Sequence, residues 1–521
     1  MSSGLQDAEP RSLSADVLVL GGGPAGAWAA IEAAEAGATV VLADKGRVGT
    51  SGATAAANTA VIDVAPGTWQ HDTVMRRRRD RGLGLVDVGT VTRTLQDTHE
   101  RLTRLGEWGY RYPSDDRGRP YRGTLRGPDY MQVLRRRLAK LGVRLLDHCP
   151  ATHLLAHDGC AAGASGLDRR TGVPWRVQAG AVVIATGGCA FMSRALGTYG
   201  LTGDGLLMAA EAGATLSGLE FSGQYGIAHA DATVTKNLIY EWATFTDRDG
   251  RVLDGDDDKF ALLARYLPEG PVFAVIDKAD AAIQEGLRRG QPNIFLALDR
   301  QGIDPFRDRF PVTLIYEGTV RGVGGVAIDR DGATRVPGLF AAGDAASREP
   351  LVGAVSGGGG PNSTWAIASG SRAGQGAAHF AEGLGPLQQT RGARRIGAVR
   401  RSAPDRNRYA TELVQGWMFP LHRNFTRDGA ALAEGRRSLD ETWWSWRDNS
   451  TAPNETPGLC SREAEAMMAV ARMICAAAAT RRETRGMHRR RDCPAFDAGQ
   501  THSLHVTGVD EIRVAPAEAA P

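Results

Sequence analysis

The amino-acid sequence predicts a mixed α/β fold that begins with a Rossmann-type domain, and three observations lead to this prediction. An apolar run at 15–20 predicts a buried strand, and the segment GGGPAG follows it at 21–26. A helical pattern then extends to Gly37, and a second apolar run at 38–44 predicts a strand that ends in Asp44. Strand, glycine turn, helix and strand in this order make a βαβ unit that binds a dinucleotide.

The glycine turn has the spacing G-x-G-x-x-G at Gly21, Gly23 and Gly26. The first glycine allows a tight turn, the second lets a pyrophosphate approach the backbone, and the third lets helix and strand pack closely. The pyrophosphate would face the free N–H groups at the start of the helix. The carboxylate of Asp44 can accept a hydrogen bond from a ribose hydroxyl. We therefore assign to the cofactor site Gly21, Gly23, Pro24, Ala25, Gly26, Asp44 and the adjoining Lys45.

Later segments offer further places where the backbone can approach a cofactor. Residues 50–60 are small and polar, although a flexible linker would have the same composition. A buried strand within 181–188 runs into a glycine turn, a strand at 338–344 ends in Gly-Asp, and a helix opens beyond 362–364. The residues assigned from these segments are Ser51, Gly52, Ala53, Thr54, Ala185, Thr186, Gly187, Gly343, Asp344, Ser363 and Thr364.

Composition narrows the classes of function. The chain has 521 residues, enough for two or three domains, and its net charge is only +3. It has no basic stripe interleaved with aromatic residues, so we expect no nucleic-acid partner. The six cysteines form no CxxC pair and no Cys/His cluster, so we expect reduced, mostly buried thiols and no metal site. No apolar run approaches the ~20 residues that cross a bilayer, and the first residues lack a signal pattern, so we expect a cytoplasmic protein without a transmembrane segment.

Seven segments occur in an order that resembles the flavoprotein subunits of the fumarate reductase, succinate dehydrogenase and L-aspartate oxidase family. They are GGGPAG, SGATAAAN, VVIATGG, TGDGLLMAAEAGA, GVGGVAID, GLFAAGD and GPNS before a helix. The segment RETRGMHRRRDCP at 482–494 is similar to the family signature ESRGxHxRxDYP and has no generic Rossmann explanation. Within the family, SGATAAANT and IYEWATF are most similar to the alpha subunit of adenylylsulfate reductase.

The resemblance implies FAD as the cofactor and a definite domain order. We expect a disordered tail at 1–14, an FAD-binding domain in two parts at 15–217 and 319–395, a capping domain at 218–318 and a helical C-terminal domain at 396–521. The resemblance also implies that FAD contacts Asp204, Asp344, Ser363 and Thr364. Several members attach the flavin through a histidine, but this chain has none between residues 1 and 70. We therefore expect non-covalent FAD.

The family's residues that hold two carboxylates are replaced in this chain. The replacing residues are Ser222 for the HPTG histidine, Tyr240 within TEG, the Asp277-Lys278 pair for an arginine, Val320 for a histidine and Gly358 near a second arginine. Holding two carboxylates and delivering a proton needs cationic or donor groups at such positions. We therefore expect succinate, fumarate and aspartate to be poor substrates.

The side chains that remain in the expected pocket are aromatic and charged. A tyrosine or glutamate could act as an acid or base, a tryptophan could stack on the substrate, and a lysine could clamp a charge. Each could equally be an ordinary core or rim residue of the capping domain. The catalytic candidates are Tyr225, Tyr240, Glu241, Trp242 and Lys278, and further charged residues near the site are Glu220, Arg321 and Arg348.

The sequence therefore predicts an FAD-dependent dehydrogenase or reductase that acts on a small organic molecule other than a C4 dicarboxylate. It contains no second complete GxGxxG unit, so the other half-reaction needs an outside partner. That partner could be an iron–sulfur or ferredoxin-like protein, another carrier, or dioxygen. Two alternatives remain: a flavin-dependent monooxygenase or oxidase, and an FAD-binding scaffold without catalysis. Substrate and oligomeric state remain open.

Overall fold

The computed structural model describes residues 11–115, 117–255, 258–356, 358–385, 392–450 and 458–517. Its largest sheet has eight strands, with the order β16-β6-β7-β8-β1-β2-β5 and β15 paired to β8. The pairs that β1 makes with β2 and β8 are parallel, as are β2–β5 and β8–β15. The strands are β1 Arg11–Leu20, β2 Val40–Ala43, β5 Arg144–Leu146, β6 Ala151–His157, β7 Cys160–Leu167, β8 Pro174–Ile184, β15 Leu339–Ala341 and β16 Arg394–Arg395.

The first strand is longer than the sequence predicts. It begins at Arg11, and residues 11–14 belong to it because they pair with residues 175–178 of β8. The expected tail therefore reaches no further than residue 10, and residues 1–10 lie outside the described part of the chain. The last residues of β1, β2 and β8 are buried and apolar, as expected of parallel strands that are covered on both faces.

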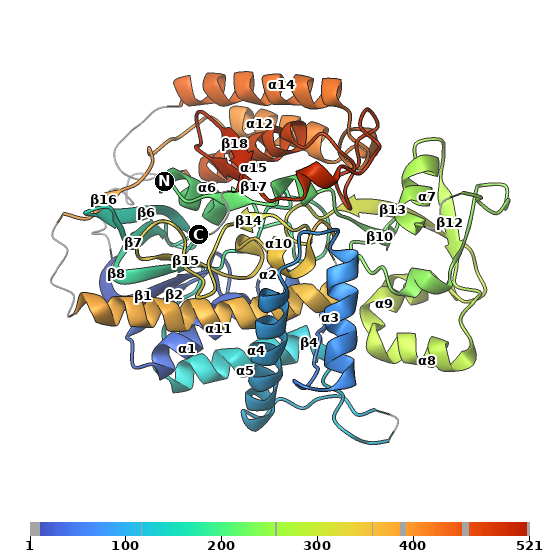
Figure 1. Ribbon diagram of the computed structural model, residues 1–521, viewed down its shortest axis with the longest axis horizontal. Helices are drawn as coiled ribbons and strands as arrows, with labels where there is room; N and C mark the ends of the chain where they lie inside the picture. Colours follow the sequence, from blue (N-terminus) through green and yellow to red (C-terminus); the bar gives the residue numbers. More distant parts are fainter. Residues whose placement is uncertain are drawn as a thin grey trace.

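Two helices pack closely on one face of this sheet (Figure 1). They are α1 Pro24–Glu35 and α11 Gly359–Leu384. A Cβ at Gly370 would lie 2.4 Å from the carbonyl oxygen of Ala25, and one at Gly374 would lie 2.2 Å from that of Ala29. Only glycine allows so close an approach, so these two positions let α11 pack directly on the backbone of α1. Neighbouring helices are α2 Gly52–Ala55, α3 Trp69–Arg81, α4 Val88–Glu107, α5 Gly127–Lys140, α6 Asp204–Glu211 and α10 Glu349–Val352, and a two-stranded sheet pairs β3 Asn58–Ala60 with β4 Thr124–Arg126.

Residues 218–318 form a smaller lobe, at the right of Figure 1. Its antiparallel sheet has the order β10-β13-β12-β11, and apolar side chains of its own make a separate core around Leu263 and Phe310. The elements are β10 Tyr225–His229, β11 Thr244–Thr246, β12 Val272–Val275, β13 Phe310–Tyr316, α7 Lys259–Tyr266, α8 Ala281–Gly290 and α9 Pro292–Arg300.

The C-terminal part is mostly helical and also contributes strands to a sheet with earlier segments of the chain. Its elements are α12 Pro404–Met418, α13 Leu421–Asn424, α14 Gly429–Asp448, α15 Leu459–Thr480, β17 Leu504–Thr507 and β18 Arg513–Pro516. A second sheet has the order β14-β9-β17-β18, which joins them to β9 Leu216–Ser217 and β14 Gly325–Val326. Trp443 and Trp446 are buried packing residues, whereas Trp444 is half exposed.

Three expectations from composition can be compared with the described residues. The six cysteines are free, and Cys149, Cys189 and Cys475 are buried. Among the described residues, no three His, Cys, Asp or Glu side chains lie close enough together to bind a metal ion. No helix in the same part of the chain is both long and apolar enough to span a bilayer.

Candidate functional site

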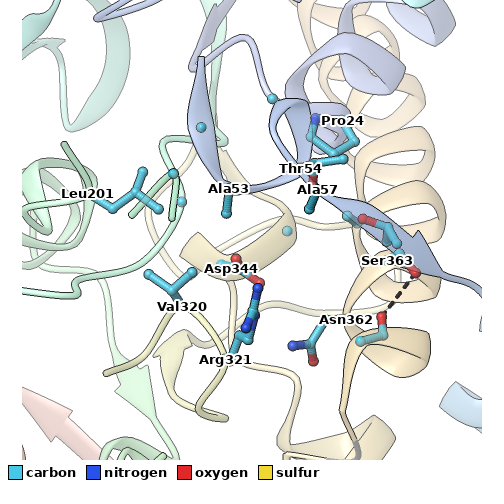
Figure 2. A pocket seen from close by; sticks show the side chains of 18 of the residues that line it. Pro24, Ala53, Thr54, Ala57, Leu201, Val320, Arg321, Asp344, Asn362 and Ser363 are labelled. Atoms are coloured by element: carbon cyan, nitrogen blue, oxygen red, sulfur yellow. Dashed lines mark hydrogen bonds between the residues drawn. The ribbon is translucent and has the colours of Figure 1, made fainter. Parts of the chain in front are cut away.

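A cavity of about 1300 Å³ opens at the carboxyl ends of β1, β2 and β8 (Figure 2). Its walls include Leu20 and Gly21 after β1, Asp44 after β2 and Ala185 after β8. Ligands of open α/β sheets bind at this edge. Sites for drug-sized ligands measure roughly 300–1,000 Å³, so this cavity can hold a dinucleotide and a small substrate together.

The three motif glycines differ in their surroundings. Gly21 has φ +105°, and a Cβ there would lie 2.3 Å from the carbonyl oxygen of Ala185. A Cβ at Gly26 would lie 1.8 Å from the carbonyl oxygen of Gly21, so Gly26 serves the packing of α1 on β1 and does not line the cavity. Gly23 lines the cavity, and no described atom lies within 4 Å of its Cβ position. Its backbone is therefore free to meet a ligand.

Asp44 is held rigidly where it meets the cavity. One carboxylate oxygen accepts from the Gly22 N–H at 2.7 Å, and the other accepts from the Gly46 N–H at 2.8 Å and the Ser51 hydroxyl at 2.7 Å. The side chain is buried yet borders the cavity. Each carboxylate oxygen has more than one lone pair, so a ribose hydroxyl can still donate to it.

The neighbouring Lys45 joins three parts of the chain. Its ammonium pairs with Asp204 at 3.0 Å and with Glu463 of α15 at 2.6 Å. Burial opposes its charge, but these two carboxylates outweigh burial and raise its pKa. The second oxygen of Asp204, Oδ1, is buried and has no partner among the described residues. A bound ligand that donates to Oδ1 would satisfy it.

Most residues that the sequence assigns to the cofactor line this one cavity. They are Gly21, Gly23, Pro24, Ala25, Asp44, Lys45, Ser51, Gly52, Ala53, Thr54, Ala185, Thr186, Gly187, Asp204, Gly343, Asp344 and Ser363. Gly26 and Thr364 are the exceptions. The hydroxyl of Thr364 accepts from the Ile62 N–H at 2.9 Å, so Thr364 is not a cavity residue and instead supports the segment after β3.

Two helices begin at the cavity wall. Gly23 precedes α1, and Gly358 with Gly359 begins α11. The first N–H groups of a helix lack partners inside it, so both ends attract anionic or electron-rich groups. The buried oxygen Oδ1 of Asn362 in the first turn of α11 has no partner among the described residues. The open glycine turn, the two helix ends and the unpaired oxygens of Asp204 and Asn362 fit a flavin dinucleotide.

A second group of polar side chains lies where the capping lobe meets the cavity. Arg321 donates to the hydroxyl of Thr235 at 2.7 Å and to the carboxylate of Glu317. Glu317 is fully buried, and its other oxygen has no partner among the described residues. In Figure 2, the guanidinium of Arg321 points toward Asp344. The carboxylate of Asp344 pairs with the buried Arg348 at 2.5 Å. Burial raises the pKa of Asp344, and both arginines oppose that shift.

Lys236 adds a second cation to this group. It lines the cavity beside Gln224 and Asn237, and its ammonium donates to the carbonyl oxygen of Asn58 at 2.6 Å. Burial, followed by the nearby charge of Arg321, lowers its pKa to about 8. Its ammonium therefore exchanges a proton close to neutral pH.

Of the five catalytic candidates, only Glu241 and Trp242 line the cavity. They lie in the 3₁₀ turn Ile239–Trp242, and the exposed carboxylate of Glu241 pairs with Lys259 at the rim.

The other three candidates lie elsewhere, so their expected place in the pocket is wrong. The ring of Tyr240 stacks on that of Phe245 in the core of the capping lobe, 6.2 Å between ring centroids. Tyr225 is buried, and its hydroxyl donates to the carbonyl oxygen of Phe419 at 3.1 Å. Lys278 donates to the carbonyl oxygen of Ala243 at 3.1 Å. Residue type indicates Tyr225, and the position within the family's TEG motif indicates Tyr240, but both aromatic rings are buried in packing, where an aromatic ring gains most.

The residues that sequence reasoning missed are Lys236, Thr235, Glu317 and Glu463. The first two lie in the segment after β10, which has no apolar periodicity and no motif. Glu463 lies on a helix of the C-terminal part, far along the chain from Lys45. The sequence indicates Arg321 only as a charged neighbour of a turn, and the cavity contact makes it a central residue of the site.

The C-terminal signature does not line the cavity. Glu483 is fully buried and accepts from Arg481 at 3.0 Å and Arg485 at 2.6 Å, while Arg481 also reaches Glu220 at 2.8 Å. Burial and the nearby Arg427 hold the pKa of His488 well below its usual value, so its neutral ring can accept from Arg427. This network ties the end of the chain to the beginning of the capping lobe.

Comparison with known proteins agrees with this geometry. A family model described as "FAD binding domain" matches residues 16–361, and one described as "Fumarate reductase flavoprotein C-term" matches residues 421–514. The L-aspartate oxidase of Mycobacterium tuberculosis is 28% identical over 558 residues, covering 97% of this chain and 98% of that protein. The fumarate reductase flavoprotein subunit of the same organism is 26% identical over 554 residues, covering 92% of this chain and 92% of that protein.

Solved structures show the same fold at lower identity. Quinol fumarate reductase FrdA of E. coli has a TM-score of 0.81 at 20% identity, covering 98% of each chain. Adenylylsulfate reductase of Archaeoglobus fulgidus has a TM-score of 0.77 at 16% identity, covering 98% of this chain and 97% of that one. The chain therefore belongs to the FAD-dependent oxidoreductase family of the fumarate reductase and L-aspartate oxidase flavoproteins, and its cofactor is FAD.

Proposed function

We propose that this protein is a dehydrogenase or reductase that transfers electrons between its FAD and a small organic anion other than succinate, fumarate or L-aspartate. The observation that carries the proposal is the cationic group at the capping lobe, where Arg321 and Lys236 both reach the cavity. The hydrogen bonds that Arg321 makes to Thr235 and Glu317 use only one of its terminal nitrogens, Nη1. The remaining N–H groups can bind a carboxylate in two-point fashion.

The cavity argues against a site for two carboxylates. No histidine lines it among the described residues, and Val320 occupies the wall next to Arg321. Lys45, Arg81 and Arg169 also line the wall, but two carboxylates already pair with Lys45, and both of these arginines are exposed. Arg321 and Lys236 together can bind one carboxylate. The rest of the substrate would contact Trp242, Leu238 and Leu201. The relatives are named for aspartate and fumarate, so these acids are the competing assignment.

When bound, FAD supplies the hydride and electron transfer. The chain itself contributes three things. Arg321, held by Glu317 and Thr235, orients the anion. The apolar residues Val320 and Leu201 exclude water from the wall near it. Lys236 Nζ can give or accept a proton, because a pKa near the working pH suits general acid–base chemistry.

The electron partner is a separate part of the proposal. An iron–sulfur or ferredoxin-like protein would suit a dehydrogenase or reductase of this family. The L-aspartate oxidase relatives favour a second candidate, in which dioxygen accepts the electrons. Release of peroxide in air, in proportion to substrate consumed, would support the oxidase. Rapid flavin reduction with negligible peroxide would support a protein partner.

The experiment is anaerobic flavin bleaching with a panel of organic acids. We expect bleaching by an acid with one carboxylate, a loss of at least tenfold in its apparent affinity in Arg321→Gln and Lys236→Gln, and no change in Lys278→Gln. Lys278 is the matched control because its ammonium is held by a backbone carbonyl away from the cavity. Turnover of succinate, fumarate or L-aspartate at about 1 per second or faster would contradict the proposal. A flavin that no acid bleaches, and that no acid reoxidises once it has been reduced, would favour a scaffold.

A further inference from the structure

Helix α3 carries an unusual concentration of positive charge. Its 13 residues, WQHDTVMRRRRDR, include five arginines and two aspartates, a net charge of +3. The whole chain of 521 residues also has a net charge of +3, so the rest of the chain is balanced. No residue of α3 is buried, and in Figure 1 the helix lies on the surface beside α4. Val74 and Met75 pack against the core, whereas four of the five arginines are exposed and contribute nothing to it.

Most of these arginines are free to act on the surroundings. Arg77 and Arg81 have no hydrogen bond or ion pair to any described residue, and Arg76 reaches only the hydroxyl of Thr73, at 3.4 Å. Arg79 pairs with Asp80 at 3.3 Å, but both side chains are about two-thirds exposed, at 65% each. Such an exposed pair is weak, and the charge of Asp80 is already counted in the net charge of +3 of the helix.

The last turn of α3 forms part of the cavity wall. Arg81, in its last turn, is exposed and at the same time lines the cavity that contains Arg321 and Lys236. Gly286 and Gly290 of α8 line the same cavity. Positive groups therefore extend from the open surface of α3 to the interior of the site.

We propose that the exposed arginines of α3 concentrate small anions at the entrance of the cavity and deliver them, past Arg81, to the flavin site. This inference rests on the proposed function in one respect, namely that the substrate is an anion. A helix of this length spans about 20 Å, and the Debye length in physiological salt is about 8 Å. The field of the helix therefore covers the entrance and weakens steeply with salt. Surfaces of one charge sign raise association rates by roughly 10–10³.

The test uses the holoenzyme and two inorganic ions of opposite charge. Photoreduced FAD is mixed anaerobically with ferricyanide, a trianion, or with hexaammineruthenium(III), a trication. Each reduced flavin loses two electrons to two complex ions and releases its protons to the buffer. The second-order rate constants are measured as a function of ionic strength in the wild type and in the triple variant R76Q/R77Q/R79Q. Arg81 is retained because it lines the cavity.

We expect the triple variant to lose about tenfold in the ferricyanide rate constant at low salt, and to gain in the hexaammineruthenium rate constant. The two proteins should converge at high salt. The matched control is R406Q/R408Q/R437Q, which removes three exposed arginines from α12 and α14, at the opposite side of Figure 1. An unchanged ferricyanide rate in the α3 variant, or an equal loss in the control, would overturn the inference.

Two further measurements keep the outcome clear. FAD content and the midpoint of thermal unfolding of the triple variant should match the wild type. If the triple variant loses FAD, the single variant Arg77→Gln must still show a lower ferricyanide rate constant and a higher hexaammineruthenium rate constant, with a smaller effect. Ferricyanide is not an organic acid and needs no binding by Arg321 or Lys236. A negative result with it therefore rejects the role of α3 and leaves the proposed substrate class intact.

Discussion

Substitution of Gly23 by valine should abolish FAD binding without unfolding the protein. The backbone at Gly23 has φ −70° and ψ −176°, which any residue can adopt. No described atom lies within 4 Å of the Cβ position, so the added methyl groups project into the cavity. We expect the free energy of unfolding of the apoprotein to change by about 0.5 kcal/mol or less, as for an ordinary surface change.

The cost to the cofactor can be worked from the same geometry. A valine side chain would keep the pyrophosphate from the first N–H groups of α1. Each charge-assisted hydrogen bond that is lost costs about 1.5–3 kcal/mol. Loss of two such bonds would cost about 3–6 kcal/mol, which corresponds to roughly 10²- to 10⁴-fold in Kd.

Gly21→Ala is the contrasting variant. Gly21 has φ +105°, and the alanine Cβ would lie 2.3 Å from the carbonyl oxygen of Ala185. Backbone strain of about 1–2 kcal/mol and overpacking of about 1–3 kcal/mol should destabilise the fold itself. The assay is flavin content per chain, Kd for FAD added to the apoprotein, and thermal unfolding. A Gly23→Val protein that purifies fully yellow with an unchanged Kd would refute the placement of the pyrophosphate.

Three further predictions follow from particular residues. Acid precipitation should release all flavin into the supernatant, because the cavity wall contains no histidine among the described residues; yellow pellets would contradict this. Affinity for the anionic substrate should fall as the pH rises through about 8, where the ammonium of Lys236 loses its proton, and Lys236→Arg should remove that fall; a KM profile against pH decides. Burial raises the pKa of Glu349 to about 7, and the neighbouring Glu220 adds to this shift. Between the ordinary pKa of 4.5 and this value, the Glu349 carboxyl group is protonated in the folded state and ionised in the unfolded state. Stability should therefore decrease between about pH 4.5 and 7, and thermal unfolding of Glu349→Gln should lack that decrease.

The fold and the cofactor site could be predicted because their signals are local. A glycine turn between an apolar strand and a helix leaves few structural alternatives, and the residues at the ends of β1, β2 and β8 meet at one edge by the geometry of a parallel sheet. The sequence does not show the strand start at Arg11 because residues 11, 12 and 14 are polar and exposed, and this segment joins the sheet only by pairing with β8.

The substrate side could not be predicted in the same way. Tyr225 begins a strand, and the sequence does not show which face of that strand meets the cavity. Its ring packs against Tyr316 and Phe425, 5.1 and 5.8 Å between centroids, under the C-terminal part. Lys236 lies in a connection without periodicity, and only the folded chain brings it to the carbonyl of Asn58.

These two outcomes have one physical cause. The cavity wall on the expected cofactor side consists largely of glycines and main-chain turns after β1, β2 and β8, and such positions tolerate wide divergence of the surrounding side chains. On the proposed substrate side, a few side chains at the junction of two lobes line the cavity, and a single replacement there changes the chemistry of the wall. Val320 replaces a histidine of the family pattern, and the adjacent Arg321 brings a cation into the same wall, fixed by Glu317 and Thr235. The Arg321 group, and not the family's usual positions, is therefore the part of the wall on which the proposed substrate class rests.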